Sequence, residues 1–195
     1  IGANHGNKKN QNIYMDTCVM KTELFISLIK EAKKLSSMYT LADILKANCG
    51  TLDIRGVAHK GFFASITDFP SYYDANMNLL DYKAAQELFH ENWPIYTRTN
   101  DSCPTQYFDT AEVKNSVISN GCQIEGTVEN SVIGRGCVIK KGAVVKNSVV
   151  LAEVTVGEGV HVENEVVDKW ARLVHEKEIV SPADQPGYIR RGDTL

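Results

Sequence analysis

Two patterns of hydrophobic and polar residues divide this chain. Before residue 92, short apolar runs alternate with stretches in which apolar residues recur every three or four positions. From Val117 onward the helical spacing disappears, and aliphatic residues recur mostly every five or six positions instead. The first pattern predicts alternating strands and helices, and the second predicts a repeat of short strands joined by turns.

The first part is typical of α/β architecture. The expected strands are residues 12–20 and 53–59, and the expected helices are residues 21–35, 41–47, 71–80 and 82–89. Thr40 is expected to cap the second helix, Ser71 to start the third and Asp81 to cap the fourth. This region therefore predicts the closing portion of an α/β domain, over residues 1–92.

Residues 93–112 contain two prolines, many polar residues and no clear period. Such a composition predicts a linker, and we place the domain boundary in it. The aromatic residues Trp93, Tyr96, Tyr107 and Phe108 would pack on the neighbouring parts of the chain. The second domain then covers residues 113–195.

The second part reads as a hexapeptide repeat. Its spaced aliphatic residues are Ile118, Ile124, Val128, Ile133, Ile139, Val145, Val150, Val156, Val162 and Val167. Three short strands with turns make one triangular coil, whose inward side chains are buried only when coils stack. The phrase Asn-Ser-Val recurs at Asn115, Asn130 and Asn147, one coil apart. Asn suits a left-handed corner, so we expect these three residues at the same corner of successive coils.

Composition and charge narrow the classes of function. Apolar residues make up 43% and charged residues 23% of the chain, and the net charge is −3. Nothing in this balance indicates nucleic acid or an anionic membrane as a partner. No apolar run of about 18 residues is present, and the start lacks the order of a signal peptide, which predicts a cytoplasmic location. The start also lacks an initiator Met and looks like a cut inside a larger protein.

The five cysteines include no C-x-x-C pair, which argues against a zinc site or a disulfide framework. Cys122 and Cys137 lie one coil apart and should stack on each other. They are either a redox pair or two small residues that fill equivalent interior positions, and we favour the second interpretation.

Two stretches resemble bacterial glucose-1-phosphate adenylyltransferase, also called ADP-glucose pyrophosphorylase. One is GFFASITDFPSYYDANMNLL at residues 61–80, and the other is NSVIGRGCVIKKGAVVKNSVV at residues 130–150. The resemblance covers essentially the whole chain. It implies the end of a Rossmann-like nucleotidyltransferase domain followed by a left-handed parallel β-helix. It also implies a role in joining ATP and glucose 1-phosphate to ADP-glucose and pyrophosphate, with Mg²⁺ as the family's metal ion.

This chain departs from the family at positions that carry chemistry. The family's Arg-Asp-Val-Gly-Thr falls on Ala64, Ser65, Ile66, Thr67 and Asp68. The family's Asp is a metal ligand, and the hydroxyl of Ser65 cannot neutralise a cation as a carboxylate does. Asp68 is three residues away, and we expect its side chain to point elsewhere.

A second family segment, Ala-Ser-Met-Gly of the sugar site, falls on residues 9–12, where its Ser and Gly are replaced by Asn10 and Asn12. A retained fold with lost chemistry favours a regulatory subunit, with no catalytic, metal or cofactor site in this chain. Its partners would be a catalytic adenylyltransferase subunit, further copies of itself, or both. ATP, glucose 1-phosphate or sugar-phosphate effectors are possible ligands.

Several alternatives stay open at this point. Arg98, Lys114, Lys140 and Lys141 are effector-site candidates because of their charge near the domain junction. The chain could instead belong to an active adenylyltransferase, or to a guanylyl- or uridylyltransferase of the same architecture. A hexapeptide acyltransferase would use a corner His, for which His161 is the one candidate in the repeat, although a surface role suits it better. A purely structural module for oligomerisation is the third class.

Overall fold

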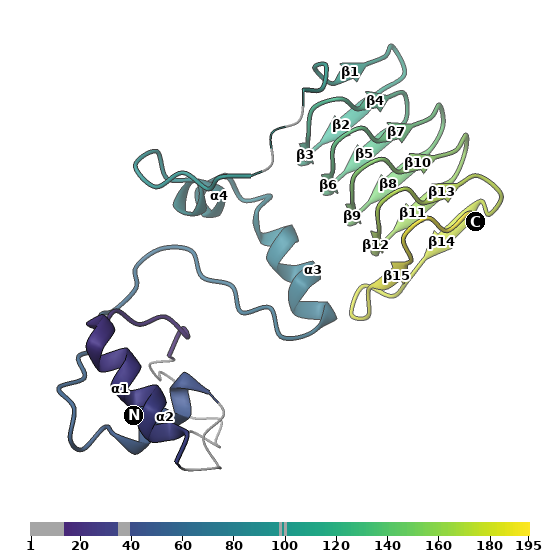
Figure 1. Cartoon of the computed structure of the whole chain (residues 1–195). Helices are drawn as coiled ribbons and strands as arrows, with labels where there is room; N and C mark the ends of the chain where they lie inside the picture. The colour runs from purple at the N-terminus through teal and green to yellow at the C-terminus, as the bar shows by residue number, and fades with distance from the viewer. Residues whose placement is uncertain (1–13, 35–39, 98, 100) are drawn as a thin grey trace. The chain divides into compact units, whose positions relative to one another are not determined.

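The computed structural model describes residues 14–34, 40–97, 99 and 101–195, which form two compact units. The first unit ends at His59, and the second runs from Lys60 to Leu195. Within its described part the first unit contains α1 (Thr22–Ala32) and α2 (Leu41–Ala47), which share a small core of Leu28, Ala32 and Ile44 (Figure 1). Thr40 caps α2 with a capping box, as its sequence predicts.

The predicted strands are absent from the described residues of the first unit. Residues 14–20 and 53–59 form no regular element, and the two predictions of a strand there were wrong. A strand is stable only when its backbone groups pair with a neighbour, and no described residue before 106 offers such a partner. The α/β architecture predicted for this region is therefore not observed in the part of the chain that the structure describes.

The second unit begins with two helices. These are α3 (Phe69–Asn78) and α4 (Tyr82–Leu88), and Asp81 caps α4 as predicted. The prediction that α3 starts at Ser71 was wrong by two residues. Asp68 is the N-cap and Pro70 lies in the first turn, where its missing N–H has no cost.

The rest of the second unit is a parallel β-helix of three sheets with five strands each (Figure 1). Sheet A consists of β1 (Gln106–Tyr107), β4 (Gln123–Ile124), β7 (Val138–Ile139), β10 (Thr155–Val156) and β13 (Arg172–Leu173). Sheet B consists of β2 (Glu112–Lys114), β5 (Thr127–Glu129), β8 (Val144–Lys146), β11 (His161–Glu163) and β14 (Glu178–Val180). Sheet C consists of β3 (Val117–Ile118), β6 (Val132–Ile133), β9 (Val149–Val150), β12 (Glu165–Val167) and β15 (Gly187–Ile189). The β-helix starts at Gln106, inside the range whose composition suggests a linker.

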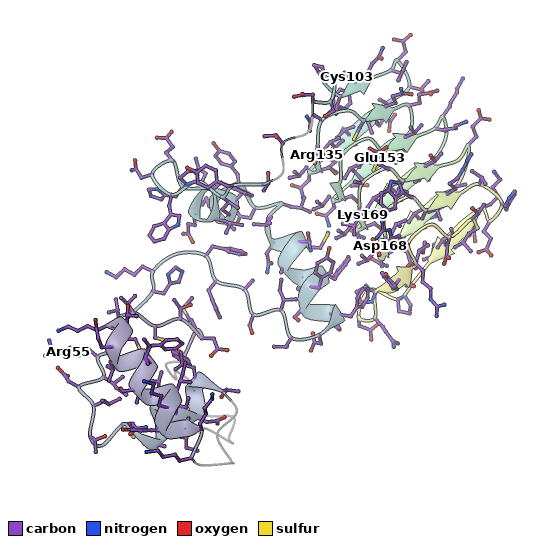
Figure 2. All side chains as sticks on the ribbon, in the orientation of Figure 1. Arg55, Cys103, Arg135, Glu153, Asp168 and Lys169 are labelled. Carbon is purple, nitrogen blue, oxygen red and sulfur yellow. The ribbon has the colours of Figure 1, made fainter. Side chains whose placement is uncertain are left out.

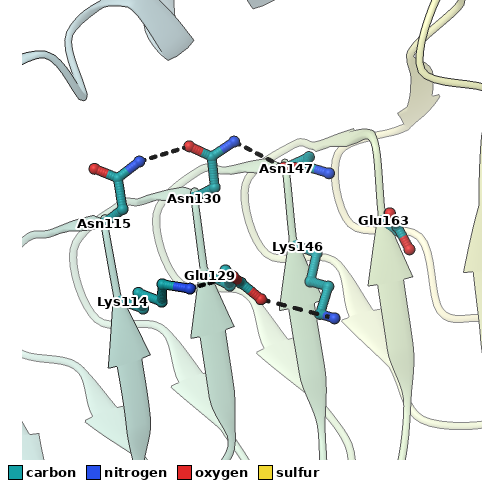
Figure 3. Close-up of a pocket in the computed structure, with 7 residues that line it drawn as sticks. All are labelled: Lys114, Asn115, Glu129, Asn130, Lys146, Asn147 and Glu163. Atoms are coloured by element: carbon teal, nitrogen blue, oxygen red, sulfur yellow. Dashed lines mark hydrogen bonds and ion pairs between the residues drawn. The ribbon is translucent and has the colours of Figure 1, made fainter.

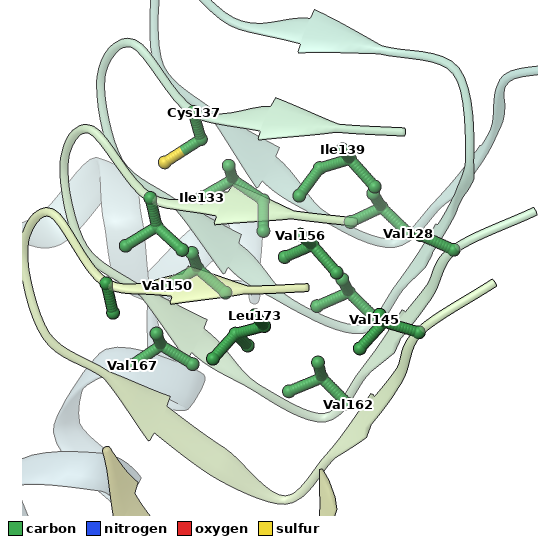
Figure 4. Close-up of a cluster of buried hydrophobic side chains, with 14 of the residues drawn as sticks. Val128, Ile133, Cys137, Ile139, Val145, Val150, Val156, Val162, Val167 and Leu173 are labelled. Carbon is green, nitrogen blue, oxygen red and sulfur yellow. The ribbon is translucent and has the colours of Figure 1, made fainter. Parts of the chain in front are cut away.

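The core of the β-helix is the stack of inward aliphatic side chains that the repeat predicts (Figure 4). Parallel pairing places Ile133 beside Val150, and Ile139 beside Val156, in successive coils. All four side chains are fully buried. Each such burial stabilises the fold by about 1.5–3 kcal/mol. A single coil could not hide these side chains, so the stack of coils is the stable unit.

The last coil is partly covered by the C-terminal residues. Thr194 forms a parallel bridge with Arg172, and the carbonyl of Leu195 accepts hydrogen bonds from the backbone N–H groups of Val174 and His175 at 2.6 and 2.7 Å. The end of the chain thus pairs with the edge strand β13, which would otherwise expose unpaired backbone groups. None of the helices in the described ranges is long and apolar enough to cross a membrane; α1, for example, has 11 residues.

Candidate functional site

The recurring phrase Asn-Ser-Val has one structural role for each residue. Asn115, Asn130 and Asn147 all adopt positive φ, at 42°, 48° and 45°, which confirms the predicted left-handed corner. Their side chains form a ladder, in which the Asn115 amide donates to Asn130 at 2.8 Å and the Asn130 amide donates to Asn147 at 2.7 Å (Figure 3). The ladder holds the coils in register along one corner.

The serines of the phrase connect consecutive coils. Ser131 Oγ donates to the carbonyl of Glu129 at 2.7 Å and accepts from the backbone N–H of Ser148 at 3.1 Å. Ser148 Oγ repeats the arrangement with the carbonyl of Lys146 and the N–H of Glu165. Both serines are fully buried, so each hydroxyl satisfies backbone groups that water cannot reach.

The valines of the phrase point outward, because side chains alternate along a strand while their neighbours Ile133 and Val150 point into the core. Outward residues usually contact water, yet Val149 is fully buried, and Val166, its neighbour in the next coil, is 1% exposed. Helix α3 covers them, since Tyr73 packs in one cluster with both valines (Figure 1). The partly buried members of that cluster are Phe69, Tyr72, Met77, Val132 and Leu151.

Tyr73 anchors α3 on the β-helix. Its hydroxyl donates to the backbone carbonyl of Asn147 at 2.6 Å. Burial, followed by the negative charge of Asp74, raises the pKa of Tyr73, so the phenol stays protonated and remains a donor. The ring of Phe69, another member of the cluster, meets that of Tyr188 edge to face, with 5.8 Å between the ring centres. The two stretches that resemble the adenylyltransferase family therefore contact each other directly.

The segment before α3 carries the altered family positions. Ser65, Thr67 and Asp68 are exposed, and Ala64 is half-buried. Asp68 is occupied as a helix cap: its carboxylate accepts from the Ser71 N–H at 2.9 Å, while Ser71 Oγ accepts from the Asp68 N–H at 3.0 Å. Hydrogen bonding of the Asp68 carboxylate with Ser71, with its side chain first and then with its backbone N–H, lowers the pKa of Asp68.

This segment does not fit the Mg²⁺ that the family reaction implies. A hard divalent cation needs several oxygen ligands, with carboxylates among them. The only carboxylate between residues 64 and 68 is that of Asp68, which caps α3. Among the described residues, no group of three or more His, Cys, Asp or Glu side chains could hold a metal ion. We therefore derive no catalytic step through a metal in this part of the chain.

Three of the effector candidates, Lys114, Lys140 and Lys141, lie within the described residues. Lys114 borders an open pocket of about 490 Å³ beside the Asn ladder, and its Nζ lies 3.3 Å from Glu129 (Figure 3). Lys140 and Lys141 are exposed in the turn from sheet A to sheet B, whereas Lys114 precedes the turn from sheet B to sheet C. These are different corners of the triangle. Arg98, Asn10 and Asn12 lie outside the described residues.

Two further charged side chains each contact a residue close by. Arg55, in the first unit, pairs with Asp53 at 2.7 Å (Figure 2). On the β-helix, Asp168 accepts a hydrogen bond from the Tyr188 hydroxyl at 2.9 Å (Figure 2). The first contact is local in the sequence, and the second connects two successive coils.

His161 is poorly placed as an acyltransferase base. It lies on the outer face of sheet B, and its Nε2 is shielded from solvent and lies 3.2 Å from Glu163 Oε2. Cys122 and Cys137 are buried free thiols, whose sulfur atoms each donate to a backbone carbonyl at 3.1 Å. The Cys122 side chain and then burial raise the pKa of the Cys137 thiol. These contacts support the interpretation of the two cysteines as interior residues.

Two features of this surface, the outward valine column and the buried Glu165, were not predicted from the sequence. The signal for the valine column was present, because every sheet C strand before β15 has an aliphatic residue at that position. Glu165 replaces the corner Ser in its coil and is only 4% exposed. Burial raises the pKa of Glu165, and a hydrogen bond from Ser181 opposes that shift.

Comparison with known proteins agrees with this architecture. The family described as GlmU-like, C-terminal hexapeptide matches residues 104–185. The glycogen biosynthesis protein GlgD of Bacillus subtilis is 30% identical over 174 residues, which cover 89% of this chain and 50% of that protein. Glucose-1-phosphate adenylyltransferase of Fervidobacterium nodosum is 34% identical over 72% of this chain and 34% of that protein. GlgD of Geobacillus stearothermophilus is 34% identical over 67% of this chain and 38% of that protein. The chain thus spans half the length, or less, of these curated relatives.

Proposed function

We propose that this chain, a homologue of the GlgD and glucose-1-phosphate adenylyltransferase proteins, acts in glycogen biosynthesis as a regulatory type of adenylyltransferase subunit. It has weak or no catalysis of its own. It works in the cytoplasm, in complex with a catalytic adenylyltransferase subunit. The complex converts ATP and glucose 1-phosphate to ADP-glucose and pyrophosphate.

The observation that carries this proposal is the state of residues 64–68. Ser65 stands where the resemblance implies a metal-binding Asp, and the neighbouring Asp68 is held as the N-cap of α3. Attack of a sugar phosphate on the α-phosphorus of ATP needs carboxylates that hold the metal ion on the phosphates. The Ser65 hydroxyl carries no charge, and the Asp68 carboxylate is engaged as a helix cap, so neither group is suited to hold the metal ion.

The retained scaffold supports the regulatory part of the proposal. The contact between α3 and sheet C is well packed, with Tyr73, Val149 and Val166 all buried. This contact connects residues 64–68 to the β-helix over a short distance in the sequence, because Asp68 caps the same helix that Tyr73 anchors. A change at a face of the β-helix therefore has a direct route to the segment before α3.

The proposal is tested by the purified full-length protein alone and by its Asp68→Asn variant. Asn keeps the N-cap but removes the charge that a metal ion requires. We expect ADP-glucose synthesis close to background for both proteins, with equal melting temperatures. Robust synthesis by the unmodified protein, abolished by Asp68→Asn, would show that Asp68 replaces the missing ligand and would overturn the proposal. Asp68→Ala serves as the structural control, and we expect it to destabilise α3 by about 1 kcal/mol without any other effect.

A further inference from the structure

The outer face of sheet B carries a column of alternating charge. Parallel register places Lys114 beside Glu129, Glu129 beside Lys146, and Lys146 beside Glu163. Within the chain, the carboxylate oxygens of Glu129 lie 3.3 Å from Lys114 Nζ and 3.7 Å from Lys146 Nζ (Figure 3). The Lys114 side chain is 80% exposed and that of Lys146 is 40% exposed. Both Lys side chains therefore remain accessible to a partner even though each is paired within the chain.

This column has a property that a random mixture of charges lacks. When its order is reversed, every Lys falls on a Glu. A second copy that faces sheet B with its long axis reversed would thus oppose Lys114 with Glu163, and Glu129 with Lys146. The strands are about 4.8 Å apart in both copies, so all of these pairs meet at the same time.

A second column on the same face has the matching order. Its residues are Glu112, Thr127, Val144 and His161, in four successive strands. The same reversal places Glu112 opposite His161, and Thr127 opposite Val144. Thr127 and Val144 thus lie beside Glu129 and Lys146 at the centre of the contact, and Glu112 lies opposite His161 at its edge, so that no like charges oppose each other in this column.

We propose that the outer face of sheet B is an isologous interface between two copies of this chain. The two-fold axis runs parallel to the strands and passes between β5 and β8. A two-fold axis in the plane of the face reverses the order of the coils but keeps each column opposite itself. A self-complementary pattern identifies the occupant as a second copy, since an unrelated partner would need only a complementary surface. This inference does not depend on the role proposed above.

A charge exchange tests the interface. One variant of the full chain, Lys114→Glu with Lys146→Glu, makes the first column wholly negative. A second variant, Glu129→Lys with Glu163→Lys, makes it wholly positive. The matched control for the first variant is Lys140→Glu with Lys141→Glu, which changes the net charge by the same amount at an exposed turn outside sheet B. The molar mass of each protein, and of the two variants mixed, is measured over a concentration series by sedimentation.

We expect the unmodified chain and the control to dimerise with similar dissociation constants. For each sheet B variant alone, the dissociation constant of the dimer should rise at least about 100-fold, because attractive contacts become like-charge contacts. Mixing the two variants should restore a dimer that contains one copy of each. Dimerisation that weakens as salt is raised towards 1 M would agree with exposed ion pairs.

Two results would overturn the inference. One is a monomeric unmodified chain throughout the concentration series. The other is a dimer that both variants form as tightly as the unmodified chain, which would place the contact on another face. Circular dichroism of the variants separates these results from misfolding. Exposed ion pairs contribute only about 0–1 kcal/mol each, so all variants should remain folded.

Discussion

The contact between Tyr73 and Asn147 gives a quantitative prediction for the docking of α3. Tyr73→Phe keeps the ring between Val149 and Val166 and removes one hydrogen bond of 2.6 Å to a backbone carbonyl. Such a bond contributes about 1 kcal/mol, so the equilibrium between docked and undocked α3 should shift about fivefold. Tyr73→Ala also removes a ring that is only 9% exposed and should cost about 3 kcal/mol or more.

Hydrogen exchange of the backbone amides measures this equilibrium locally. We expect peptides from α3 to exchange about fivefold faster in Tyr73→Phe and at least 100-fold faster in Tyr73→Ala. Peptides from the inner strands β8 and β10 should exchange as in the unmodified protein. Tyr96→Phe is the matched control, because the Tyr96 side chain is 91% exposed. Unchanged exchange in α3 of Tyr73→Phe, or equal acceleration throughout the β-helix, would refute the reasoning.

Three further predictions concern the corner between sheets B and C. Ser148→Ala leaves the buried N–H of Glu165 without its acceptor and should lower the free energy of unfolding in urea by about 1–3 kcal/mol; Ser116→Ala, at the more exposed first coil, should cost less. Asn130→Ala forces a residue with a Cβ but no amide into positive φ and should lower that free energy by about 1 kcal/mol or more, whereas Asn130→Gly should lower it less. Because the pKa of Glu165 is raised, its contribution to stability is fully present below the ordinary pKa of Glu and is lost as the pH rises through the folded-state value. Glu165→Gln should therefore be more stable than the unmodified protein at pH 7, with the difference disappearing below about pH 4; a constant difference at all pH values would contradict the assignment.

The β-helix could be predicted in detail because its period is set by local geometry. The spacing of Ile133, Ile139 and Val145 fixed the inward face, and the return of Asn130 to the corner of Asn147 fixed the length of a coil. Each strand pairs with the next coil at nearly the same sequence distance. A repeat of this kind carries its long-range contacts in its own pattern.

The packing of α3 could not be predicted in the same way. The distance between Tyr73 and Asn147 along the chain is 74 residues, and no periodicity connects the two. A clue was present in the outward residues: Val132, Val149 and Val166 are aliphatic, while the corresponding residues of sheet B include Lys114 and Glu129. An outward aliphatic column indicates a covered face, but it does not identify the covering element.

The strands predicted at residues 12–20 and 53–59 show where local sequence patterns mislead. Apolar runs such as Val57 with its neighbours satisfy a propensity, but a strand forms only where another strand accepts its hydrogen bonds. The start of α3 was shifted for a more local reason. Asp68 is as good an N-cap as Ser71, and it precedes Pro70, which favours the first helical turn.

The mixing of this protein with a catalytic partner tests the central claim most directly. The rate of ADP-glucose synthesis is measured for the protein alone, for a glucose-1-phosphate adenylyltransferase from the same organism alone, and for the two combined over a range of ratios. The account predicts a rate near background for the first, and for the mixture a rate or effector response that differs from that of the catalytic subunit and saturates at a fixed ratio. A mixture whose rate equals the sum of the two separate rates at every ratio, with and without effectors, would contradict it.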